Sequence, residues 1–299
     1  MQMQDVRNLI IENARKTINQ RGNPVLLLDL KEVSKNDLLS IHDLLCKKQF
    51  DALDVVLQTP GGDIDAAFLI IKILRKHAKK INVIVPLYAK SAGTLICLGA
   101  DQILMTDLSE LGPLDTQIAE HQDGGQIRYI SALNGFKALE QVRLHTVETL
   151  DIVTKLLLNR SSMKIPEAVR LATEFSGQTS GTLYSKLNPE KIGEYARALE
   201  IGERYGITLL TRYCRWQQDK AESVIKTLVQ QYPSHGFIID LEELQLLGLP
   251  AVKIDDGMLD VMIDFRKQLL KMDETIIELV EKIKSNTPPS NTTQPKSNQ

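Results

Sequence analysis

Residues 53–99 read LDVVLQTPGGDIDAAFLIIKILRKHAKKINVIVPLYAKSAGTLICLG, and their pattern determines the fold class. It predicts a strand over 53–57, a helix over 64–79, a second strand over 81–87 and a second helix over 92–99. The apolar residues of the first helix recur at helical spacing and make one face. Strands that alternate with helices in this rhythm indicate parallel βαβ units with right-handed crossovers. The sequence therefore predicts an α/β core.

Each of these strands runs into a turn of small residues that opens the next helix. The first turn is Pro60-Gly61-Gly62 and the second is Lys90-Ser91-Ala92. Because the carboxyl ends of neighbouring parallel strands meet at one edge of a sheet, we expect the two turns to lie together. The backbone N–H groups of Gly62 and Ala92 are the expected donors to an oxyanion, with Gly61 supporting the first turn. Ser91 is the expected nucleophile, so the pattern favours a serine hydrolase.

Composition and charge narrow the class of protein. The 299 residues are 43% hydrophobic and 25% charged, which is ordinary for a globular protein with a sizeable core. A net charge of -2 gives no reason to expect nucleic acid as a partner. Three widely spaced cysteines indicate free thiols in a reducing compartment. We see neither a signal peptide nor an apolar run that could anchor the chain in a membrane, and we expect a cytoplasmic protein.

After about residue 112, the pattern changes from alternating strands and helices to mostly helices. We expect a long helix over 131–160, shorter helices after it, and one late strand over 236–240. The expected organisation is an N-terminal helix over 1–22, a hydrolase domain over 23–250, an amphipathic helix over 251–284 and a disordered tail over 285–299. The apolar stripes of 4–20 and 257–284 either form interfaces between copies or pack on the chain's own core.

Nothing in the sequence indicates a cofactor or a metal. Asp63 and Asp65 begin a predicted helix, where carboxylates cap free N–H groups and favour the helix dipole. No cluster of His and Cys has the spacing of metal ligands, and the glycine pair is followed by no phosphate-loop lysine. We therefore expect no cofactor and no metal site.

Three motifs, in this order, resemble the Clp-protease/crotonase superfamily. They are LQTPGGD at 57–63, AKSAGT at 89–94 and LGPLDTQ at 111–117. A fourth, YPSHGFIID at 232–240, is similar to the serine dehydrogenase proteinase family, to which signal peptide peptidase A is related. The resemblance covers residues 25–250 and implies a Clp/crotonase-like core with a helical C-terminal extension. It also implies a homo-oligomer that hydrolyses the peptide bonds of a peptide or protein substrate through an acyl-enzyme on Ser91.

The resemblance further implies that His235 is the general base. This residue follows Pro233-Ser234 and precedes a glycine and a short apolar run, so the sequence gives it a fixed position in a loop. Four other histidines lie in predicted helices or in a polar loop, and we expect no catalytic role for them: His42 and His77, on solvated helix faces, His121 and His145.

The acid of the triad is open between two aspartates. The order serine, aspartate, histidine described for the family is satisfied by Ser91, Asp115 and His235, and Asp115 would then orient the imidazole. Asp115 stands where the proteolytic subunit of Clp protease carries its histidine. Asp240 competes for the role, although it can instead cap the helix that follows it.

The same two turns are also compatible with a different catalytic base, a different class of enzyme, or an inactive protein. A Ser–Lys dyad, as in signal peptide peptidase A, would place its lysine in the long helix after the core, where neither Lys137 nor Arg143 fits; Lys164 and Lys186 stay open as the base. Lys90 does not suit that role, because neighbouring side chains of an extended segment point to opposite sides. A crotonase-like enzyme would use the same two N–H donors on acyl-CoA thioesters, and an inactive relative would only bind peptides.

Overall fold

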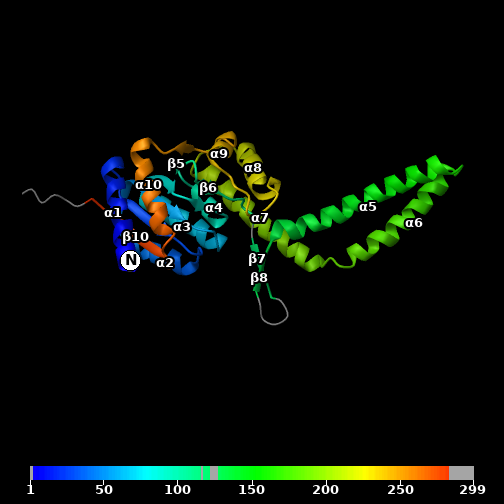
Figure 1. Cartoon of the computed structure of the whole chain (residues 1–299), viewed down its shortest axis with the longest axis horizontal. Coiled ribbons are helices and arrows are strands. Elements are labelled where there is room, and N and C mark those ends of the chain that lie inside the picture. The colour runs from blue at the N-terminus through cyan, green and yellow to red at the C-terminus, as the bar shows by residue number, and fades with distance from the viewer. Residues whose placement is uncertain (1–2, 116, 122–126, 283–299) are drawn as a thin grey trace, which may run out of the picture.

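The chain forms a layered α/β body from which two helices project as a long arm (Figure 1). The structure is a computed structural model and describes residues 3–115, 117–121 and 127–282. The arm consists of α5 (Ala132–Arg160) and α6 (Ile165–Tyr184), the green helices on the right of Figure 1. The parallel βαβ core and the helical C-terminal part expected from the sequence are both present.

The body is built on a central sheet that contains six strands of the described chain. Their order is β10-β1-β2-β3-β5-β9. All neighbours pair in parallel except β10, which lies antiparallel to β1 at one edge. The strands are β1 (Val25–Asp29), β2 (Phe50–Gln58), β3 (Ala78–Val85), β5 (Gln102–Met105), β9 (Ala251–Lys253) and β10 (Ile276–Val280). The turns after β2 and after β3 therefore fall at the same edge of the sheet.

Helices cover both faces of this sheet because successive strand residues point to opposite sides. Leu26 and Leu28 of β1 face a core shared with α2 (Lys35–Leu45), α3 (Ile64–His77) and α4 (Ala92–Leu98). Val25 and Leu27 face a second core formed with α1 (Met3–Arg21) and α10 (Asp256–Leu269). The central strands are thus buried on both sides, which explains their almost continuous apolar sequences.

The remaining elements connect the body to the arm and close the C-terminal half. There are two small sheets, β4 with β6 in parallel and β7 with β8 antiparallel; β4 precedes α4 in sequence, and the other three strands lie between α4 and the arm. Their bounds are β4 (Tyr88–Ala89), β6 (Glu110–Leu111), β7 (Gln117–His121) and β8 (Ile127–Ser131). The helices that follow the arm are α7 (Pro189–Arg212), α8 (Gln218–Lys226), the π-helical turn η1 (Thr227–Gln231) and α9 (Leu241–Leu246). No helix in the described ranges has both the length and the apolar character needed to cross a bilayer.

The prediction of one amphipathic helix over 251–284 is wrong. The segment contains β9, then α10, which ends at Leu269, then β10 at the edge of the sheet. Pairing with β1 decides the state of Ile276–Val280, because the antiparallel ladder joins the facing backbone groups of the two strands. The tail predicted over 285–299 lies outside the described residues.

The apolar stripes of α1 and α10 pack against the chain's own sheet. Ile10 of α1 and Phe265 of α10 are both fully buried in the second core. Of the two alternatives left open by the sequence, packing within the chain is therefore the one observed. The late strand expected over 236–240 is reduced to a single antiparallel bridge between Ile239 and Leu111.

Candidate active site

The two glycine turns lie side by side at the carboxyl edge of the sheet. The N–H of Thr59 donates to the carbonyl of Tyr88 at 3.1 Å, and the N–H of Lys90 donates to the carbonyl of Thr59 at 3.0 Å. Gly93 is packed so closely that a Cβ added there would lie 2.6 Å from Cγ2 of Thr59. The shared backbone bonds and this close approach fix one turn against the other.

Ser91 occupies a strained turn immediately before α4. Its φ of 51° and ψ of -112° lie in a backbone region that residues other than glycine rarely adopt. Such strain persists only where the surrounding structure holds it. Gly61 is pressed against it: a Cβ on Gly61 would lie 2.9 Å from Cβ and 3.4 Å from Oγ of Ser91. The hydroxyl therefore sits next to the first glycine turn, at the start of a helix, as a nucleophile elbow would place it.

Two backbone N–H groups of these turns are free within the described structure. Gly62 (φ 142°) holds its turn against Val33, whose carbonyl oxygen would lie 2.4 Å from an added Cβ. Neither the N–H of Gly62 nor that of Ala92 donates a hydrogen bond to any described residue. Free donors beside a serine hydroxyl are the elements from which an oxyanion hole is made.

Asp115 and His235, 120 residues apart in sequence, are in direct contact. Nδ1 of His235 lies 2.5 Å from Oδ1 of Asp115. The Asp115 side chain is 1% exposed and that of His235 is 21% exposed, so the carboxylate is buried and the imidazole reaches the surface. The contact occupies Nδ1 and leaves Nε2 as the ring nitrogen available for other chemistry.

The second oxygen of Asp115 is held by a residue that the sequence did not single out. The hydroxyl of Ser131 donates to Oδ2 of Asp115 at 2.6 Å, and the same hydroxyl accepts from the N–H of Asn134 at 3.2 Å. Ser131 is thus the N-cap of α5, the first helix of the arm. A serine before a long helix predicts such a cap, but its bond to Asp115 depends on the fold.

The loop that carries His235 is fastened to the segment that carries Ser91. Nζ of Lys90 donates to the carbonyl of Gly236 at 3.3 Å and lies 3.3 Å from Oε2 of Glu110. Two backbone bonds join Leu111 to Ile239. These contacts bring the neighbours of Ser91 and of His235 together, although no hydrogen bond joins those two residues in the described structure.

Aromatic stacking stiffens the same loop from the other side. The rings of Tyr232 and Phe237 stack at 4.8 Å between centroids. The Tyr232 hydroxyl donates to Glu243 at 2.7 Å. Burial, together with this bond, raises the pKa of Tyr232, which keeps the hydroxyl protonated and donating. His235 is therefore presented by a loop tied down at both ends.

The competing acid, Asp240, has a different task. Its carboxylate accepts from the N–H of Glu243 at 2.9 Å and is the N-cap of α9. Asp63 likewise caps α3, and Asp65 accepts from the Tyr205 hydroxyl. No group of ligating side chains suited to a metal ion is found in the described part of the chain.

The remaining histidines stand apart from the site. His42 and His145 are exposed on α2 and α5. The expectation that His77 is solvated is wrong: it is 7% exposed and its Nδ1 lies 2.8 Å from the carbonyl oxygen of Lys48. His121, expected in a polar loop, instead ends strand β7.

The lysines considered for a Ser–Lys dyad belong to the arm. Lys137 lies in α5, Lys164 precedes α6 and Lys186 follows it. Lys90, next to Ser91, has its ammonium bound to Glu110 and Gly236 instead.

Comparison with known proteins fits this geometry. The model of the ClpP-like SDH-type serine proteinases matches residues 6–159, just over half of the chain. The chain belongs to this family. The matched range includes both glycine turns, Ser91 and Asp115, and ends before His235.

The curated relatives of this SDH-type proteinase are themselves uncharacterised. MJ0137 of Methanocaldococcus jannaschii is 28% identical over 197 residues, 66% of this chain and 52% of the relative. MJ1495 of the same organism is 33% identical over 151 residues, 50% of this chain and 44% of the relative. The chain therefore spans about half the length of the curated relatives it matches.

Two solved structures with detectable likeness have low sequence identity to this chain. A ClpP1 mutant from Listeria monocytogenes is 12% identical with a TM-score of 0.37, covering 82% of this chain and 98% of that one. A mutant of the 1510-N membrane-bound stomatin-specific protease is 21% identical with a TM-score of 0.29, covering 51% of this chain and 70% of that one. At these scores the likeness adds nothing to the family match.

Proposed function

We propose that this SDH-type proteinase is a serine peptidase that cleaves peptide bonds through an acyl-enzyme on Ser91, with His235 as base and Asp115 as acid. The observation that carries the proposal is the contact between His235 Nδ1 and Asp115 Oδ1, made beside the strained turn of Ser91. A buried carboxylate on Nδ1 fixes the tautomer and ring orientation of a histidine, which suits Nε2 to take a proton.

The first half-reaction forms an ester and releases an amine. Oγ of Ser91 attacks the carbonyl carbon of the scissile peptide bond while Nε2 of His235 removes the hydroxyl proton. The oxyanion that forms accepts hydrogen bonds from the N–H groups of Gly62 and Ala92. The C–N bond then breaks, and the amine leaves with the proton that His235 had taken.

The second half-reaction restores the enzyme. His235 takes a proton from water as the water oxygen attacks the ester carbonyl, and the same two N–H groups stabilise the second oxyanion. The bond to Oγ of Ser91 breaks, the serine recovers the proton, and a carboxylate product leaves. Because Ser91 and His235 are not hydrogen-bonded in the described structure, their approach accompanies substrate binding or assembly.

The role of Asp115 depends on more than its histidine. A carboxylate with both oxygens engaged, one by His235 and one by Ser131, has a fixed plane. A fixed carboxylate holds the imidazole in one orientation and stabilises its cation during the reaction. We therefore assign Ser131 a positioning role in the same site.

The test is a substrate comparison that separates this proposal from its rivals. Casein and a fluorogenic peptide library are compared with acyl-CoA thioesters for the unaltered chain, for Ser91→Ala and for a control, Ser40→Ala, in an exposed serine of α2. Peptide hydrolysis that is lost only in Ser91→Ala supports the proposal. Thioester turnover that survives Ser91→Ala would favour a crotonase-like enzyme and contradict it.

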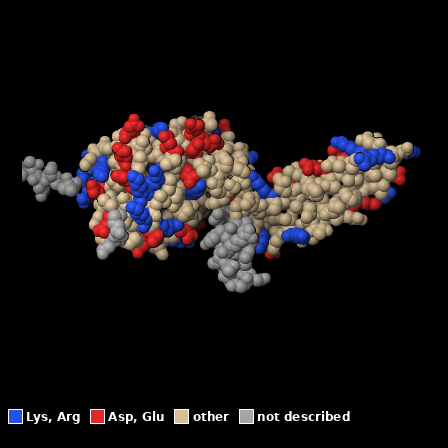
Figure 2. Space-filling model, in the orientation of Figure 1, with Lys and Arg blue, Asp and Glu red and all other residues tan. Residues whose placement is uncertain are grey.

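We also propose that copies of the chain associate through the arm. Large apolar side chains are exposed along α5 and α6, among them Val147 (60%), Ile152 (57%) and Ile165 (65%). Figure 2 shows wide uncharged areas along the arm, with basic residues gathered toward its tip. Exposed apolar surface of this extent marks an interaction site.

A cytoplasmic location stays a prediction and is supported by three free thiols.

A further inference from the structure

A pocket remote from Ser91 opens at the far end of α4, the helix that follows the candidate nucleophile. It has a volume of about 410 Å³. Ala100 and Asp101 line it, and they follow the C-terminal end of α4 whereas Ser91 precedes its first residue. The other side is formed by the segment after α7, which contributes Tyr213, Arg215 and Trp216. The pocket therefore lies beyond the opposite end of α4 from the candidate active site.

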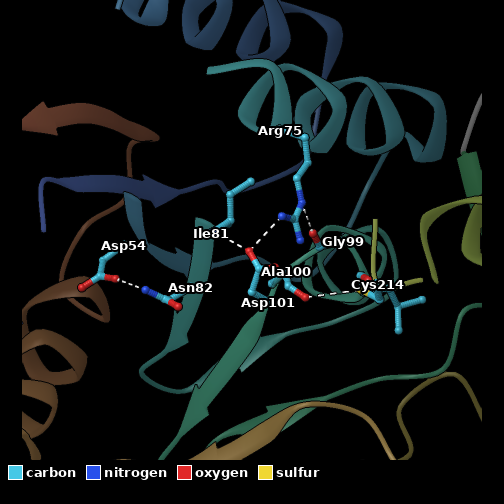
Figure 3. Close-up of polar contacts among 9 residues, drawn as sticks. Asp54, Arg75, Ile81, Asn82, Gly99, Ala100, Asp101 and Cys214 are labelled. Carbon is cyan, nitrogen blue, oxygen red and sulfur yellow. Dashed lines mark hydrogen bonds and ion pairs between the residues drawn. The ribbon is translucent and has the colours of Figure 1, made fainter. Parts of the chain in front are cut away.

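Arg75 is a buried cation at this pocket with part of its guanidinium unused. Its Nε donates to the carbonyl of Gly99 at 2.7 Å, and Nη1 donates to Oδ2 of Asp101 at 2.8 Å (Figure 3). The side chain is 8% exposed, yet Nη2 has no hydrogen-bond partner in the described structure. Nη2 is itself buried, and a buried charged donor without a partner costs free energy, so an acceptor that came within reach of Nη2 would stabilise the site.

Arg215 provides a second guanidinium, and this one has no partner among the described residues. It is exposed at the pocket and makes no hydrogen bond or ion pair with another described residue. Its φ is 57°, an uncommon value for a residue with a side chain. Strained backbone of this kind is found at ligand sites more often than elsewhere.

The electrostatics of the pocket favour an anion. Its lining contains three cations, Arg75, Lys79 and Arg215, and one carboxylate, Asp101, a net charge of +2. Lys79 shares an exposed ion pair with Asp51 at 2.7 Å, which solvent screens. Oδ2 of Asp101 accepts from Arg75 and from the N–H of Ile81, which offsets part of its charge, while the side chain stays 33% exposed at the pocket.

We propose that this pocket binds the phosphate group of a small molecule. A phosphate monoester carries close to two negative charges at neutral pH, which matches the lining, and offers several acceptors to guanidinium donors. The aromatic rings beside the cations add a surface for an organic substituent: the Tyr213 ring centroid lies 5.6 Å from the Arg75 guanidinium carbon, and Lys220 lies 3.8 Å from the Trp216 ring centroid. The site uses no residue of the candidate active site.

The chain carries its own probe for this site, because Trp216 is its single tryptophan. Trp216 emission is titrated with inorganic phosphate and with phenyl phosphate, against sodium chloride at equal ionic strength. We expect a saturable change with phosphate compounds alone. Tighter binding of phenyl phosphate would identify a phosphate ester as the ligand, and equal binding would identify inorganic phosphate.

Matched variants make the titration decisive. Arg215→Gln removes a cation of the pocket, and we expect it to weaken binding about tenfold or more. Arg15→Gln removes an exposed cation of α1 on the other side of the sheet, and it should bind as the unaltered chain does. Arg75→Lys keeps the charge but replaces the planar guanidinium, with its several N–H donors, by an ammonium group, and it too should weaken binding. A response to chloride equal to that to phosphate, or unchanged binding by Arg215→Gln, would overturn the proposal.

Discussion

Helices α4 and α5 show how differently one chain uses its apolar residues. All seven residues of α4 are buried, and the helix is locked between the sheet, the glycine turns and α7. In α5, which has 29 residues, only Ala132 and Leu133 are buried. The body therefore has a fixed interior that defines the geometry of Ser91, whereas the arm leaves many of its large apolar side chains exposed.

Rigid packing and exposed apolar surface thus occur in separate parts of the molecule. A strained serine and two glycines at unusual φ values persist only where the surroundings over-determine them, and the body provides those surroundings. Ser131 joins the two parts, because one hydroxyl caps α5 and holds Asp115. If body and arm differ in this way, matched substitutions in the two parts should have unequal effects.

The largest effect is expected in the body, at the carboxylate that holds His235. Asp115→Asn should lower kcat by about 10⁴-fold, because the amide favours the wrong histidine tautomer. Asp151→Asn, which removes an exposed carboxylate of α5, should leave kcat unchanged. Asp240→Asn should do the same, since asparagine is an equally good N-cap. Steady-state peptide hydrolysis measures all three, and equal losses for Asp115 and Asp240 would contradict the assignment of the acid.

The next effect compares two glycines, one in each part. Gly62→Ala would force a side chain onto the Val33 backbone at a φ of 142°, and we expect it to lower the free energy of unfolding by about 3 kcal/mol or more. Gly177→Ala, in α6, meets nothing within 4 Å and should raise the stability of the helix by about 0.5–1 kcal/mol. Urea unfolding followed by circular dichroism measures both. Similar changes in the two variants would show that the turn is not over-determined.

A smaller effect is expected at the junction. Ser131→Ala should lower kcat about tenfold with little change in KM, because Asp115 loses one of its two fixed bonds. It should also cost about 1 kcal/mol of stability through loss of the cap. Ser131→Thr restores the hydroxyl and should recover kcat, and Ser161→Ala at the other end of α5 is the matched control. A purely structural role would lower stability without changing kcat.

The smallest effect concerns a buried carboxylate of the sheet. Burial raises the pKa of Asp29 above its ordinary value of 3.8, although Lys31 partly offsets this. A raised pKa in the folded state means that the folded chain holds the proton more tightly, so stability falls as pH rises through that pKa. Asp29→Asn should therefore raise Tm slightly at pH 7, and the gain should shrink as pH falls toward 3.8. A gain in Tm that grows as the pH falls would contradict a raised pKa for Asp29.

The sequence predicted the elements whose cause is local. The order strand, turn, helix, strand, turn, helix over 53–99 is observed, because period and turn residues determine it within a few positions. The N-terminal helix expected over 1–22 is present for the same reason. Pro60-Gly61-Gly62 and Lys90-Ser91-Ala92 were placed together correctly, since parallel strands bring their ends to one edge.

The sequence failed where distant pairing decides. The segment 276–280 has no periodicity that separates a helix end from an edge strand, and β1 settles it. The bond from Ser131 to Asp115 joins a helix cap to a loop, and only the fold reveals it. Choosing His235 and Asp115 before the structure depended on the resemblance of the motifs, because nothing local links residues 120 positions apart.

The most direct test of the central role of Ser91 is covalent labelling with a fluorophosphonate, followed by peptide mass spectrometry. The label reacts only with a serine activated by a base and an oxyanion hole. We expect one phosphonate on the peptide that contains Ser91, a much slower reaction in His235→Ala and none in Ser91→Ala. A folded chain that takes up no label, or takes it up equally in Ser91→Ala, would contradict the assignment of Ser91 as the nucleophile.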